Sequence, residues 1–147
     1  MDDVEMTSDE HLRALAALEV VAKGGDEEEL MALAGDDGEH PLPALLVAYG
    51  RHTLQRILLA VFGADDTMSR DEITLRVDEI NEDPLARMTF ALTSTLRTQA
   101  ASAGNSPVAA KQIGMSLLLA VHALTGADTD DALTLLRALR GEALRDA

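Results

Sequence analysis

The stretch KQIGMSLLLAVHAL, residues 111–124, is the densest apolar run in the sequence and decides the class of fold. A helix here is apolar on two adjoining sides, one with Ile113, Leu117, Ala120, Val121 and Leu124, the other with Met115, Leu118 and Leu119. Such a helix is usually buried by several neighbours. The run is shorter than the roughly 20 residues that cross a bilayer and contains Ser116 and His122. It therefore predicts a core helix of a soluble protein.

The composition extends the helical prediction to the whole chain. Its 147 residues suit one domain, 47% of them are hydrophobic, and only 2% are aromatic. The apolar residues are mainly Leu and Ala, which favour helices over strands. We predict an all-α, single-domain helical bundle of about seven helices over residues 7–147, with central apolar helices near 42–62 and 107–125. Residues 1–6 are expected to form a flexible acidic tail.

Capping signals place the ends of the expected helices. Thr7 to Glu10 and Ser69 to Glu72 have the spacing of capping boxes, and Asp26, Asp83 and Ser106 are further expected N-caps. Glycines 24–25, 35, 63, 104 and 126 are expected to end helices. A last helix from residue 128 or 129 is amphipathic, with a stripe of Ala132, Leu136, Leu139 and Ala143.

Helical spacing also predicts which residues face the core. The expected stripes are Leu12, Leu15, Leu18 and Val21 in the first helix, Ile73, Val77 and Ile80 in the fourth, and Leu85, Met88, Leu92 and Leu96 in the fifth. Gly50 and Gly114 interrupt the two most apolar helices. We expect these helices to cross near the two glycines with their backbones close together, or else simply to tolerate the glycines.

The charge is distributed unevenly along the chain. Its net charge is −14, and residues 1–40 hold thirteen acids and two bases, 2 − 13 = −11, whereas residues 85–127 hold no acid. In so acidic a chain, a region without carboxylates is expected to be buried, to face a partner, or both. The overall acidity fits solubility, a salty host cytoplasm or a high-GC genome. It argues against nucleic acid or an anionic membrane as a partner.

No motif in the sequence carries recognisable chemistry. The four histidines are isolated from one another, and HExxH, EF-hand, GxSxG, GxxxxGK[ST] and GxGxxG patterns are absent. The chain has no cysteine, which excludes disulfides and thiolate metal sites. The first residues lack a basic segment followed by an apolar one. We therefore predict a cytoplasmic, non-enzymatic protein without catalytic residues, cofactor or metal.

Tyr49, His52 and Arg56 form the best candidate ligand site, because spacings of three and four place them along one side of a helix. An anionic ligand or a partner's carboxylate would fit there. The structural alternative is that Tyr49 and His52 pack at the rim of the bundle while Arg56 pairs with an acid. His122 is interpreted as a core histidine, with a buried pH-sensitive group as the alternative.

The leading hypothesis is a helical interaction or adaptor protein that self-associates or docks on a protein partner through an apolar helical face. Ala132, Leu136, Leu139 and Ala143 are the expected interface of a homodimer, although the same stripe would also serve to close the core. One alternative is a small-molecule-binding or sensory domain that uses Tyr49, His52 and Arg56. Another is an acidic mimic that blocks a nucleic-acid-binding protein through residues 1–40.

Overall fold

The computed structural model describes residues 7–33, 40–65, 67–126 and 134. Within them the chain forms six helices and no strand, which confirms the all-α bundle. The helices are α1 (Ser8–Ala22), α2 (Glu27–Met31), α3 (Leu42–Val61), α4 (Arg70–Glu82), α5 (Pro84–Ala103) and α6 (Pro107–Thr125). The expected tail at 1–6 and the expected last-helix stripe of Ala132, Leu136, Leu139 and Ala143 lie outside the described residues.

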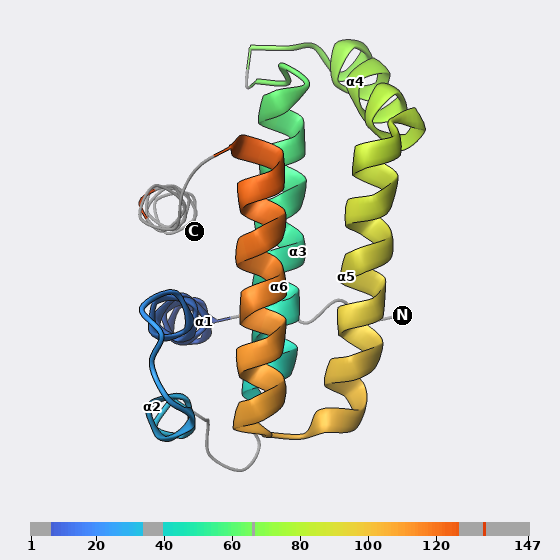
Figure 1. The fold of residues 1–147 in the computed structure, drawn as a ribbon. Coiled ribbons are helices and arrows are strands. Elements are labelled where there is room, and N and C mark those ends of the chain that lie inside the picture. The colour runs from blue at the N-terminus through green and yellow to red at the C-terminus, as the bar shows by residue number, and fades with distance from the viewer. Residues whose placement is uncertain (1–6, 34–39, 66, 127–133, 135–147) are drawn as a thin grey trace.

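Three long helices, α3, α5 and α6, run side by side, and α1 crosses them (Figure 1). The helix α3 packs against α1, α4, α5 and α6, and α6 packs against α1, α2, α3 and α5. The two apolar helices that the sequence placed at the centre are therefore the central ones. At one end of the bundle α4 packs against α3 and α5, and on another side α2 packs beside α1 against α6.

The helices begin at the expected caps. Thr7 Oγ1 accepts a hydrogen bond from the Glu10 amide at 3.2 Å, and Glu10 Oε1 accepts one from the Thr7 amide at 3.1 Å, which completes a capping box. Side chains at positions 26, 69, 83 and 106 likewise accept from the amide three residues on. The start of α3 is capped from elsewhere, because Asn105 Oδ1 accepts from the Leu42 amide at 3.0 Å.

The helices α3 and α6 meet at Gly50. A Cβ atom there would overlap Leu117 Cδ2 and lie 2.7 Å from Leu117 Cδ1, so a side chain fits only if Leu117 shifts. Gly114 instead faces α1, since its Cβ would lie 3.0 Å from Val21 Cγ2. The expectation that both glycines mark the crossing of these two helices is right for Gly50 and wrong for Gly114, because α1 lies across α6 at that point.

The expected core stripe of α5 is displaced. Leu85 and Met88 are 46% and 70% exposed, and Leu92 is half-buried. Leu96 is buried as expected, and the other residues that α5 buries are smaller, namely Ala86, Thr89, Thr93 and Ala100. The two threonines are tolerated in the core because their hydroxyls donate to the carbonyls of Leu85 and Phe90, both at 2.9 Å. Small side chains let α5 lie close to α3, and the large ones are left at its edge.

Two other expected stripes are only partly buried. In α1, Leu12 is 42% exposed, and Ala14 and Ala17 are buried in its place. In α4, Ile80 is buried while Ile73 and Val77 are each 38% exposed. The reason is that α4 touches only one end of the bundle, so its outer turns have no helix to pack against.

We predict that Gly50→Ala destabilises the protein, although alanine is the better helix former by about 1 kcal/mol. The added methyl overlaps buried Leu117, and overpacking of this kind costs about 1–3 kcal/mol. Urea unfolding would measure the loss. Gly114→Ala should cost less, because the nearest atom to the added methyl, Val21 Cγ2, would lie 3.0 Å away and the next two would be in ordinary contact at 3.5 Å.

A double-mutant cycle with Leu117→Ala provides the control for this prediction. The double variant should be more stable than the sum of the single effects implies, because the smaller side chain makes room for the methyl group. A Gly50→Ala protein as stable as the wild type would contradict the close approach of α3 and α6.

Candidate interaction surface

The three residues of the sequence-predicted ligand site lie at different depths. Tyr49 is 3% exposed, and its ring meets the ring of His11 edge-on, with centroids 5.8 Å apart and planes at 72°. His52 is exposed and Arg56 is half-buried. The phenol therefore belongs to the packing between α1 and α3, and the imidazole and guanidinium lie nearer the surface.

A small cavity borders Tyr49 on its inner side. Its lining comes from α1, α3 and α6 and consists of Leu18, Tyr49, Gly50, Thr53, Leu54, Leu117, Leu118 and Val121. Its volume of about 10 Å³ is close to the space that one water molecule requires. A metabolite does not fit there, so a ligand of Tyr49, His52 and Arg56 would have to bind on the surface beside His52.

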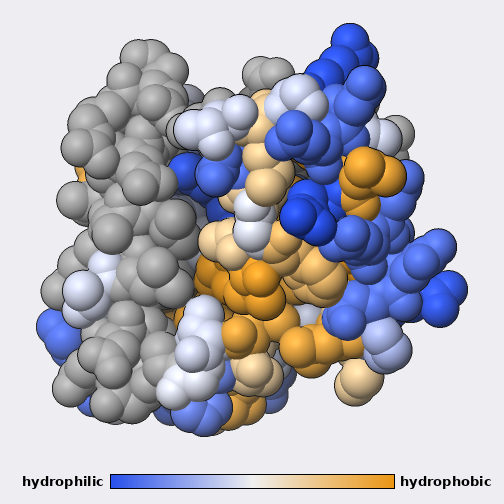
Figure 2. Space-filling model, turned by 90° about the horizontal axis from the view of Figure 1, so that it is seen from above, coloured by the Kyte–Doolittle hydropathy of each residue, from blue (hydrophilic) through white to orange (hydrophobic). Residues whose placement is uncertain are grey.

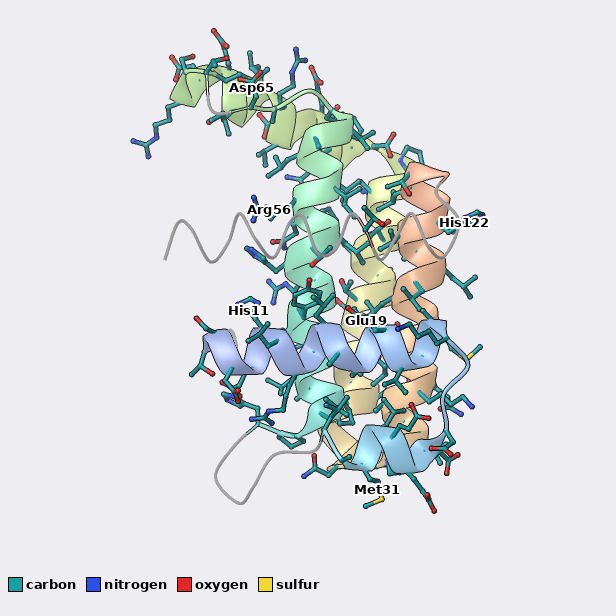
Figure 3. The ribbon with its side chains drawn as sticks, turned by 90° about the vertical axis from the view of Figure 1, so that its left-hand side faces the viewer. His11, Glu19, Met31, Arg56, Asp65 and His122 are labelled. Atoms are coloured by element: carbon teal, nitrogen blue, oxygen red, sulfur yellow. The ribbon has the colours of Figure 1, made fainter. Side chains whose placement is uncertain are left out.

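His11 is the residue that sequence reasoning missed at this site. Figure 3 shows it on α1, on the same side of the molecule as Arg56 on α3. Partial burial of the largely exposed His52 lowers its pKa, and the charges of Arg56 and His11 lower it further. Burial also lowers the pKa of His11, which Glu10 partly offsets. The crossing of α1 over α3 brings these groups together, and no spacing along one helix could have indicated it.

Two further histidines lie in different settings. His122 is exposed on α6, at the other edge of the view in Figure 3, so the interpretation as a core histidine is wrong. His40 Nδ1 lies 2.8 Å from Oε2 of buried Glu10. Burial raises the pKa of Glu10, but hydrogen bonds from the Thr7 amide and His40 outweigh it, so the pKa is lowered. This pair ties the start of α1 to the segment before α3.

The described part of the chain separates its acids from its three long helices. The helices α3, α5 and α6 contain no Asp or Glu, whereas α1, α2 and α4 each carry several. Among the described residues, no three His, Asp or Glu side chains gather as metal ligands. The absence of acids suits α3, which is surrounded, but α5 and α6 each keep one side exposed.

The exposed sides of α5 and α6 adjoin and form one apolar face. We call it the α5/α6 face; it comprises Leu85, Met88, Leu92, Thr95 and Gln99 of α5 and Val108, Gln112, Met115, Leu119 and Ala123 of α6. Gln99 Nε2 donates to Gln112 Oε1 at 3.2 Å and fixes the register of the two antiparallel helices. This register sets Met88 and Leu92 beside Leu119 and Ala123.

The largest side chains of this face are its most exposed ones. Met88 is 70% exposed, Leu119 is 67% and Met115 is 50%. Figure 2 views the end of the bundle at which α4 lies, along the long helices, and shows hydrophobic residues in the middle of that end and hydrophilic ones on the side of α4. Monomeric soluble proteins seldom expose contiguous apolar patches larger than a few hundred Å². The α5/α6 face is therefore the strongest candidate for a functional surface.

Among the described helices, α6 is long and apolar enough to span a membrane. Over its most apolar part, 33% of the helix is buried inside the protein. Its inner side supplies Ile113 and Leu117, which are 0% and 2% exposed and complete the core. The core of the bundle thus depends on α6, and only its outer side is available to other molecules.

Comparison with protein-family models, with curated proteins and with solved structures finds no match for this chain.

We predict that acid lowers the stability of the fold through His52 and His11. Their pKa values are lowered in the folded protein from an ordinary value of 6.5, so the unfolded chain binds protons more readily. The free energy of unfolding should therefore be highest above pH 6.5 and should fall as the pH drops below it.

Urea unfolding at one protein concentration, between about pH 8 and pH 5, would measure this fall. In His52→Gln, which cannot take up the proton, the fall should be shallower than in the wild type. Parallel stability profiles for the two proteins would contradict the assignment.

Proposed function

We propose that the chain is a non-enzymatic helical interaction protein that engages a protein partner through the α5/α6 face. The observation that carries this proposal is the exposure of Met88, Met115 and Leu119 together on one uncharged face of an otherwise acidic chain. Covering such a face stabilises a complex by about 25 cal/mol for each Å² of apolar surface removed from water.

The composition of the face suits a protein partner. Aromatic residues and methionine are enriched in interfaces, and charged residues are depleted at their centres. Here methionines and leucines fill the half of the face nearer α4 and reach its middle at Met115, while Thr95, Gln99 and Gln112 add polar groups in the middle and toward the turn. Methionine side chains adapt to irregular surfaces because they are unbranched and polarisable. The face therefore has the features of a helix-packing surface.

A membrane is the less suitable partner. Helices that lie in a membrane interface carry Lys or Arg on the polar side and often Trp. The chain has no Trp, and its net charge of −14 would be repelled by anionic lipids. A protein surface fits better, because it can match an uncharged apolar face without requiring flanking bases.

The other sequence-based hypotheses stay predictions. In the ligand-binding hypothesis, His11 lies next to Tyr49 and joins the candidate site of Tyr49, His52 and Arg56. A ligand would reach this site at the exposed imidazole of His52. In the acidic-mimic hypothesis, the exposed carboxylates of Glu27, Glu28 and Glu29 on α2 would contact the partner. Neither hypothesis explains why large apolar side chains of α5 and α6 are exposed, so we place both below the interaction hypothesis.

Site-specific photocrosslinking would test the proposed function. A photoreactive amino acid in place of Leu119, on the face, should give adducts with a protein that mass spectrometry can identify. The same group in place of Leu75, which is 63% exposed on α4, is the matched control and should not give them. The purified partner should then bind the wild type, and Met88→Glu should weaken binding at least about tenfold, or about 1.4 kcal/mol.

The result that would overturn the proposed function is the absence of any protein adduct specific to position 119. Adducts that form equally from position 75 would overturn it as well, because they would show only nonspecific collision.

A further inference from the structure

We infer that the occupant of the α5/α6 face is a second copy of this chain, so that two pairs of helices form a four-helix bundle; this inference rests on the proposed function. In the described part of the chain, α5 and α6 are two adjacent antiparallel helices of nearly equal length whose outer sides are covered by no other helix. A pair of this kind is half of a four-helix bundle.

The size of the face is adequate for a dimer. The two helices have 20 and 19 residues, so each is about 30 Å long at a rise of about 1.5 Å per residue. Side by side they present on the order of 600 Å², and a standard interface buries about 800 Å² on each partner. Two such faces bury about 1,200 Å² in total, which is at the lower end of the range for specific interfaces.

Charge restricts where two copies can meet. Each chain has a net charge of −14, and the described acids lie on α1, α2, α4 and the adjoining segments. Contact through those elements would bring carboxylates of the two copies together, which is unfavourable. None of the residues that define the α5/α6 face is charged. Two copies can therefore approach through this face without direct repulsion.

Charge also selects the relative orientation of the copies. Glu79, Glu82 and Asp83 lie at the end of the face where α4 joins α5. The other end of the face, at the turn from Gly104 to Ser106, carries no acid of its own, and Lys111 lies one turn into α6. The glutamates of α2 lie beside this end, on the side of α6 away from α5 (Figure 1). A two-fold axis perpendicular to the helices places the acidic end of one copy beside the acid-free end of the other. A parallel arrangement would bring the two acidic ends together.

Sedimentation equilibrium of the purified full chain tests the inference directly. We expect a species of twice 15.6 kDa with a dissociation constant of about 1 µM or lower. Leu119→Glu on α6 and Met88→Glu on α5 should each raise that constant at least about tenfold, since they bury a carboxylate against an apolar surface. Both side chains are mostly exposed in one copy, so the helical content measured by circular dichroism should stay unchanged.

The matched control is Leu75→Glu on α4, where the original side chain is 63% exposed. It adds the same charge outside the face and should leave the dissociation constant within about twofold of the wild type. Equal weakening by Leu75→Glu and Leu119→Glu would show that added negative charge alone separates the copies, and would overturn the assignment of the face.

Two further results would overturn the second copy as occupant. One is a monomer at all concentrations up to about 1 mM together with a specific crosslink from position 119 to a different protein, a result that leaves the proposed function intact. The other is a monomer that floats with phosphatidylcholine vesicles and no longer does so as Leu119→Glu. A monomer with neither behaviour would overturn both the inference and the proposed function.

Discussion

The contact of Leu117 with Gly50 is the constraint on which the rest of the structure depends. The glycine lets the backbone of α3 approach the side chains of α6, and Leu117 fills that space with 2% exposure. The inner side of α6 therefore packs against α3. Val21 of α1 packs against the adjoining side of α6, where Gly114 leaves space for it. Among the described residues, Met115 and Leu119 then remain on a side of α6 that these packings leave exposed.

The same arrangement accounts for the distribution of charge. Carboxylates are confined to α1, α2, α4 and the adjoining segments among the described residues, and the long helices α3, α5 and α6 have none. Burial explains this for α3, which has helices on several sides. It does not explain why the outer sides of α5 and α6 carry no carboxylate. The α5/α6 face carries no charge although it is exposed in one copy. A second surface that covers this face would explain the absence of charge.

Local signals made the fold class and the helix starts predictable from the sequence. A cap such as Thr7 with Glu10 acts within one turn, so spacing alone identifies it. The burial of α5 was not predictable in this way, because Leu85 and Met88 have core-like spacing and the bundle buries Thr89 and Thr93 instead. The proximity of His11 to His52 could not be predicted from the sequence either, since it depends on how α1 crosses α3. The acid-free stretch at 85–127 was the one sequence signal that pointed to the α5/α6 face.

Methionine oxidation footprinting, read by mass spectrometry, tests the central claim most directly. Met88 and Met115 lie on the α5/α6 face, and Met31 on α2 is 59% exposed and serves as an internal reference. If a second copy covers the face, Met88 and Met115 should oxidise several-fold more slowly as the protein concentration rises through the dissociation constant, while the oxidation of Met31 stays constant. Equal and concentration-independent oxidation at all three methionines would contradict the account.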